Sequence, residues 1–107
     1  SQRGGFLYFQ GEGKANPAMD NLTQRKSLAK EAAILTGKAK IASYISQLKR
    51  KREETVAQAL LKDKVLKLKV QAFIDGVEIV ESRWDEEDNC QVTLRISKKK
   101  LLKKLNP

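Results

Sequence analysis

The chain has 107 residues, the usual size of one domain, and its 22 lysines and arginines against 13 aspartates and glutamates give a net charge of +9. This charge favours acidic partners at long range. The sequence has no histidine, the commonest general base and metal ligand, and its one cysteine, Cys90, cannot form a disulfide within the chain. We therefore expect one domain over residues 1–107, with no enzymatic activity, metal site, cofactor or small-molecule substrate.

A short strand is expected near the beginning of the chain. Residues 6–10 are mostly aromatic and β-favouring, and Gly11 and Gly13 are expected to end the strand. Residues 7–11 also match the core of a protease site that is used to remove purification tags. We interpret them as native because they supply an apolar strand, with a tag remnant as the alternative. Residues 1–5 are expected to be disordered or derived from a tag.

A long helix is expected from Asn16, as the N-cap, with Pro17 at the first helical position, to about Leu48. Apolar residues recur in this region at spacings of three and four, which predicts one buried helical face. Ala29 and Ala33 widen that face without bulk, so the helix backbone can lie close to a sheet. The predicted face consists of Leu28, Ala32, Leu35, Ala39, Ala42 and Ile45.

A second helix is expected from Glu53 to about Ile74, ending at Asp75 and Gly76. In this helix Leu61 and Leu68 are expected to be buried. The other residues of its predicted apolar face are Val56, Leu60, Val65 and Ala72. Apolar residues also alternate with polar ones over residues 65–73, which is the pattern of a strand and remains the alternative.

Residues 77–84 and 90–97 are rich in β-favouring residues, and an acidic segment, residues 85–89, joins them. This pattern predicts an antiparallel hairpin. The second strand alternates strictly, so one face of the sheet is expected to be buried and the other solvated. Residues 98–107 are expected to form a short basic helix, which Ser97 can cap. The predicted fold is a two-layer α+β domain, a small antiparallel sheet packed by a long helix and a second helix, in the order β-α-α-β-β-α.

Several short motifs carry a resemblance to a known family, and they span residues 11–96. They are Gly11-Glu12-Gly13, Asn16-Pro17, Gln24, Ala29-Lys30-Glu31-Ala32-Ala33, Ile41-Ala42, Ile45, Thr55-Val56, Phe73-Ile74-Asp75-Gly76 and Val80. In their order and spacing the chain resembles the bacterial family named for the twenty-kilodalton surface lipoprotein of the LPP type, which includes the flagellar proteins FlgP and FlgT. The resemblance implies a dodecin-like strand-helix-strand-strand module without catalytic residues.

The resemblance also implies a place in the cell envelope, in the periplasm or outer membrane, and a structural or protein-interaction role. The expected partners are further copies of the chain or other envelope and flagellar proteins. The given residues contain no signal peptide and no lipidation cysteine. The candidate partner surface is the free edge of the sheet and the solvated hairpin face, represented by Trp84, Thr93 and Arg95.

The positive charge supports a second hypothesis, a basic module that binds nucleic acid. The candidate surface for an anionic partner is Lys49, Arg50, Lys51 and Arg52, and an anionic lipid surface is a further use of the same charge. Most of the basic residues are lysines with few aromatic residues among them, which is more typical of a solvated face. The acidic segment 85–89 lacks the spacing of a calcium loop.

Overall fold

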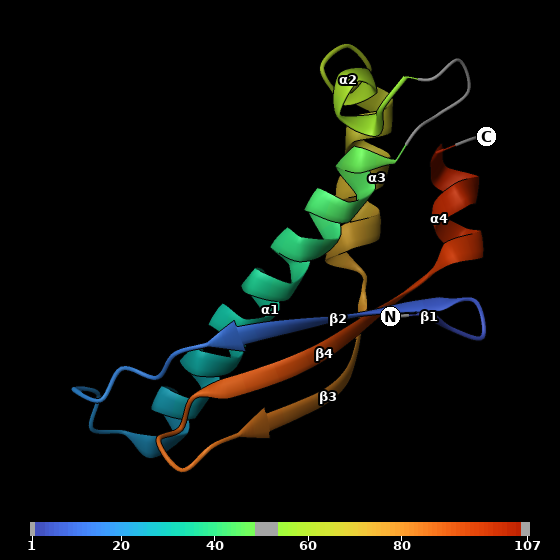
Figure 1. The fold of residues 1–107 in the computed structure, drawn as a ribbon. Helices are drawn as coiled ribbons and strands as arrows, with labels where there is room; N and C mark the ends of the chain where they lie inside the picture. Colours follow the sequence, from blue (N-terminus) through green and yellow to red (C-terminus); the bar gives the residue numbers. More distant parts are fainter. Residues whose placement is uncertain (1, 49–53, 106–107) are drawn as a thin grey trace.

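The computed structural model describes residues 2–48 and 54–105, and it forms an α+β domain in which a long helix crosses one face of an antiparallel sheet and the shorter helices lie beyond the end of the sheet (Figure 1). The expected order of elements is confirmed, with a two-residue strand added at the beginning and the second helix divided in two. The elements are β1 (Gln2–Arg3), β2 (Phe6–Gly13), α1 (Leu22–Gln47), α2 (Val56–Leu60), α3 (Lys64–Asp75), β3 (Glu78–Trp84), β4 (Cys90–Ser97) and α4 (Lys98–Leu105).

The sheet has the strand order β1-β2-β4-β3, so β4 lies in its centre and pairs along its length with β2 and β3. The alternation predicted for β4 is confirmed, because Cys90, Val92, Leu94 and Ile96 are buried. Residues 2 and 3, which belong to the segment expected to be disordered or derived from a tag, form β1. Gly4 and Gly5, with φ of 52° and 83°, form the turn between β1 and β2.

β2 continues through Gly11 and ends at Gly13, so of these two glycines only Gly13 ends the strand as expected. They lie where α1 crosses the sheet at very close range. A Cβ atom on Gly11 would collide with the Ala33 carbonyl and lie 2.5 Å from the Gly37 nitrogen, and one on Gly13 would lie 2.5 Å from the Ala33 nitrogen. The glycines therefore allow the strand backbone to contact the helix backbone directly.

The predicted buried face of α1 is displaced by about one residue. Leu35 is 67% exposed, and Ala39 and Ala42 are also exposed. The buried positions recur every four residues and are Ala29, Ala33, Gly37, Ile41 and Ile45. The small residues of this row face Gly11 and Gly13 of β2, because bulky side chains such as Leu28 and Leu35 would hold the helix away from this strand. Of the predicted face, Ile45 is fully buried and Ala32 is partly buried.

The helix α1 also begins later than expected. Asn16 and Pro17 belong to a turn in which the Asn16 side chain accepts a hydrogen bond from the Ala18 N–H at 3.0 Å. The N-cap is Asn21, whose side chain accepts a hydrogen bond from the Gln24 N–H at 2.9 Å.

The expected second helix is confirmed as helical rather than extended over residues 64–75, but it is interrupted before that segment. Asp63 caps α3 by accepting a hydrogen bond from the Leu66 N–H at 3.0 Å. The predicted burial of Leu61 and Leu68 is wrong, because these side chains are 89% and 72% exposed. Val56 is buried as expected, and the other buried residues of the segment are Ala59, Leu66, Val70 and Ile74.

The C-terminal part of α1 extends beyond the sheet to α2 and α3, and α4 stands beside α3 (Figure 1). Ser97 caps α4 through a hydrogen bond from the Lys100 N–H at 3.2 Å. Leu101 and Leu105 of α4 join one hydrophobic cluster that continues from the sheet into the helices. The molecule is elongated, 52 × 30 × 17 Å, with α2, α3 and α4 at one end and the β3–β4 turn at the other.

Candidate functional site

One face of the sheet carries no covering layer in the described part of the chain, since α1 crosses the opposite face (Figure 1). The strand register places a mixture of polar, charged and aromatic side chains on this uncovered side. We call it the open face. It consists of Phe6, Tyr8, Gln10, Glu12, Glu78, Glu81, Arg83, Gln91, Thr93 and Arg95.

Arg95 lies on the central strand β4 and contacts both neighbouring strands. Its guanidinium carbon lies 4.3 Å from the centre of the Phe6 ring on β2. On β3, its Nη2 donates a hydrogen bond of 3.3 Å to Glu78, and its Nε lies 2.6 Å from Glu78 Oε2 but outside hydrogen-bonding geometry. Contacts with Tyr8 and then Glu78 raise the pKa of Arg95 above its ordinary value, so the side chain stays cationic.

The structure brings Thr93 and Arg95 together on the open face but places Trp84 on the opposite side. The Trp84 Nε1 donates a hydrogen bond of 3.0 Å to the Lys26 carbonyl of α1, and Lys30 lies 6.0 Å from the ring centre. The reason is a β-bulge between Ile79 and Glu81, which reverses the alternation of β3. Trp84 therefore connects the end of β3 to α1 and does not lie on the open face.

The acidic turn between β3 and β4 is organised by hydrogen bonds and by a contact with α1. Asp88, with φ of 65°, accepts hydrogen bonds from Arg25 Nε and Nη2 at 3.0 and 2.9 Å. Asn89 accepts a hydrogen bond of 2.8 Å from the Ala15 N–H, and its side chain donates to Asp85. This last bond is the main reason why the pKa of Asp85 is lowered. The turn thus holds the beginning of α1 against the sheet.

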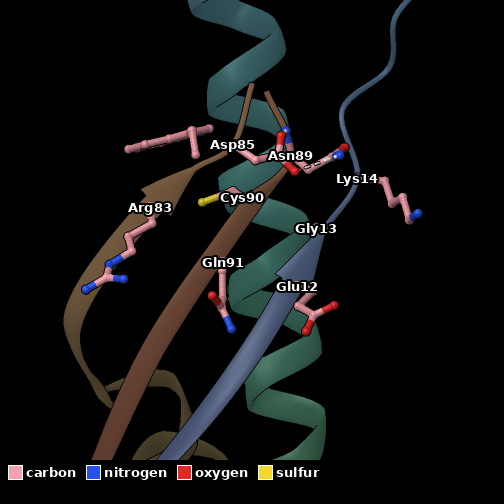
Figure 2. A pocket seen from close by; sticks show the side chains of 9 residues that line it. Glu12, Gly13, Lys14, Arg83, Asp85, Asn89, Cys90 and Gln91 are labelled. Carbon is pink, nitrogen blue, oxygen red and sulfur yellow. Dashed lines mark hydrogen bonds between the residues drawn. The ribbon is translucent and has the colours of Figure 1, made fainter. Parts of the chain in front are cut away.

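A shallow hollow of about 460 Å³ lies at the end of the sheet beside this turn (Figure 2). Figure 2 shows that the side chains of Glu12, Arg83 and Gln91 extend from the neighbouring strands around it. Cys90 also lines the hollow. This residue is only 2% exposed, and burial raises the pKa of its thiol. A protonated, buried thiol is a poor nucleophile. Its other lining residues are Gly13, Lys14, Trp84, Asp85 and Asn89.

The end of the molecule formed by α2, α3 and α4 is strongly basic. Over residues 54–77 and 97–105 it has nine lysines and three acidic residues, Glu54, Asp63 and Asp75. We call this part the basic end, and its lysines are Lys62, Lys64, Lys67, Lys69, Lys98, Lys99, Lys100, Lys103 and Lys104. The candidate anionic-partner residues Lys49, Arg50, Lys51 and Arg52 lie outside the described residues.

Two groups of surface residues were missed by the sequence analysis. Phe6 and Tyr8 lie with Arg95 on the open face. They alternate along the strand with Leu7 and Phe9, and this alternation could have predicted that Phe6 and Tyr8 face away from the core. The second group is an exposed apolar stripe on α3, which the sequence analysis assigned to the core. Residues 64–75 contain two apolar rows on opposite sides of the helix. A helix that packs against a core on one side needs only one such row, so the second row was the available signal.

Among residues 2–48 and 54–105, no group of three or more metal-ligating side chains is placed to hold an ion. In the same residues no helix is both long and apolar enough to cross a bilayer. Comparisons with protein-family models, with curated proteins and with solved structures find no match to this chain.

Proposed function

We propose that this chain is a non-enzymatic structural module of the cell envelope that associates with further copies of itself through the open face of its sheet. The observation that carries the proposal is the arrangement around Arg95. The face is uncovered, and the Arg95 side chain on it contacts Phe6 and Tyr8 of β2 on one side and Glu78 of β3 on the other. Aromatic residues and arginine are the types enriched at protein–protein interfaces.

The charges of the open face also suit association between identical copies. Arg83 and Arg95 lie on this face with Glu12, Glu78 and Glu81, so both signs are present. In a two-fold symmetric dimer, the same surface patch meets itself, and each arginine of one copy can approach a carboxylate of the other. The net charge of +9 makes copies repel one another at long range, and physiological salt screens this repulsion beyond about 8 Å.

The free edge of β3 is a less suitable contact than the open face. The bulge at Val80 breaks the regular row of backbone groups that an added strand would need. Charged side chains also line this edge strand, at Glu78, Glu81 and Arg83, and such features protect an edge from pairing. We therefore assign self-association to the face and not to the edge.

Two further observations support a role without catalysis in the envelope. The hollow beside Cys90 combines a buried thiol of raised pKa with no histidine in the whole sequence, so it offers no activated nucleophile. The sequence motifs between residues 11 and 96 resemble envelope lipoproteins and flagellar proteins. The competing proposal, nucleic-acid binding, draws its support from the lysines of the basic end.

Sedimentation velocity over a range of micromolar concentrations tests the proposal. The parent chain is expected to form a dimer or larger species as its concentration rises. Arg95→Glu should abolish this species, whereas Lys40→Glu, an equal change of charge at an exposed position of α1, should retain it. A parent chain that sediments as a monomer at every concentration would contradict self-association.

A further inference from the structure

The outer side of α3 carries an apolar stripe that no described part of the chain covers. Val65 and Leu68 are 62% and 72% exposed, and Ala72 is also exposed. Spacings of three and four residues place them on one side of the helix. We call these three residues the outer stripe of α3. The helix has its core contacts on the opposite side, through Leu66, Val70 and Ile74.

Lysines stand on both sides of the outer stripe. Lys64 lies one turn before Leu68, and Lys69 lies one turn after Val65 and one turn before Ala72. Both lysine side chains are exposed. The adjacent helix α4 adds five more lysines and an exposed Leu102 to the same end of the molecule.

We infer that α3 docks on the surface of an anionic lipid bilayer, with its outer stripe in the interfacial region and the neighbouring lysines at the headgroups. An amphipathic helix with an apolar face and flanking lysines binds a bilayer by apolar burial together with attraction to anionic lipids. Long lysine side chains can lie along the apolar boundary while their charged ends reach the headgroups. The basic end would then contact the membrane while the open face of the sheet remains accessible.

The same lysines could contact nucleic-acid phosphates, but that interaction leaves the outer stripe unexplained. A phosphate backbone attracts cations and offers no apolar layer to Val65 and Leu68. The basic end also has no exposed aromatic side chain on which a base could stack: Phe73, its one aromatic residue among the described residues, is partly buried in the core. The combination of an apolar stripe with lysines therefore favours the lipid surface.

Vesicle flotation tests the inference on the full chain. Vesicles of phosphatidylcholine with phosphatidylglycerol should bind the parent at physiological salt, and vesicles of phosphatidylcholine alone should not. The variant Val65→Ser/Leu68→Ser should bind the anionic vesicles at least about tenfold more weakly than the parent does. The matched control is Leu35→Ser, which removes a similarly exposed leucine from α1 and should bind as the parent does. Lys64→Gln/Lys69→Gln should also weaken binding, in contrast to Lys38→Gln/Lys40→Gln.

A reporter variant distinguishes insertion from simple charge attraction. Tryptophan fluorescence of Leu68→Trp should shift to shorter wavelength on addition of anionic vesicles, while Leu35→Trp should not shift. Equal melting temperatures will show that these surface variants are folded. Vesicle binding that is unaffected by Val65→Ser/Leu68→Ser would overturn the inference. Tighter binding to duplex DNA than to anionic vesicles, with a steep dependence on salt and no effect of the serine changes, would assign the lysines to nucleic acid instead.

Discussion

Gly11 of β2 lies directly against Gly37 of α1, and a Cβ atom on Gly11 would be 2.5 Å from the Gly37 nitrogen. The neighbouring contact of Gly13 with Ala33 has the same character. At these points the strand and helix backbones touch, and each side chain that would separate them is absent or reduced to a methyl group. This contact fixes how α1 crosses the sheet and leaves the other face of the sheet open.

Gly11→Ala should destabilise the domain by about 3 kcal/mol or more, at the upper end of the range for overpacking, because the added methyl group meets backbone atoms that cannot rotate away. Gly76→Ala is the matched control, since its Cβ would lie 3.5 Å from the nearest atom, the Ala72 carbonyl oxygen, without a clash. Urea unfolding of both variants gives the comparison. Equal stability of the two variants would mean that α1 does not approach β2 so closely.

The face of α1 is tested by two substitutions of the same kind. Ala33→Leu should lower the free energy of unfolding by about 1–3 kcal/mol, because Ala33 is fully buried against Gly11 and Gly13 of β2. Ala39→Leu should change it by less than about 0.5 kcal/mol, because residue 39 is exposed. Thermal unfolding measures both. A larger loss in Ala39→Leu than in Ala33→Leu would restore the face that includes Leu28 and Leu35.

The helix and strand types were largely predictable from the sequence, but the buried sides of the helices were not. The strict alternation from Cys90 to Ser97 and the end of α3 at Gly76 gave correct predictions. In α1 the large residues Leu28 and Leu35 suggested the wrong face. The true face is chosen by the glycines of β2, which accept only small residues, and this tertiary requirement is not visible in the periodicity of the helix alone.

The candidate partner surface was predictable in part for a similar reason. Thr93 and Arg95 follow from the alternation of β4. An unbroken alternation along β3 would place Trp84 on the same side of the sheet as Glu78 and Arg95. The bulge between Ile79 and Glu81 changes this parity, and the local sequence contains no glycine to mark it.

The ion pair of Arg25 with Asp88 should couple the β3–β4 turn to α1 by about 1 kcal/mol, because both side chains are mostly buried and Arg25 donates two hydrogen bonds. A double-mutant cycle of Arg25→Ala and Asp88→Asn, followed by urea unfolding, measures this coupling. Asparagine is used at position 88 because it tolerates the positive φ of 65°. Additive effects of the two changes would show that the pair contributes nothing.

Burial raises the pKa of Cys90 above its ordinary value of 9.0, with a smaller opposing effect of Lys30. The unfolded chain therefore loses this proton at lower pH than the folded chain. The contribution of the protonated thiol to stability should be complete below pH 9.0 and decline as pH rises through the folded pKa. The difference in unfolding free energy between the parent and Cys90→Ala should thus be constant near neutral pH and shrink above pH 9.0. A difference that stays constant to higher pH would contradict the burial of the thiol.

The most direct test of self-association through the open face is a pulsed electron resonance measurement between spin labels on separate copies. The label is attached at Thr93→Cys in a Cys90→Ala background, and a second sample carries it at Leu35→Cys on the exposed side of α1. We predict strong dipolar coupling between copies for the label at position 93 and weak or no coupling at position 35. Absence of coupling at position 93 at concentrations where the chain is associated would show that the copies meet through another surface, and would contradict the proposed function.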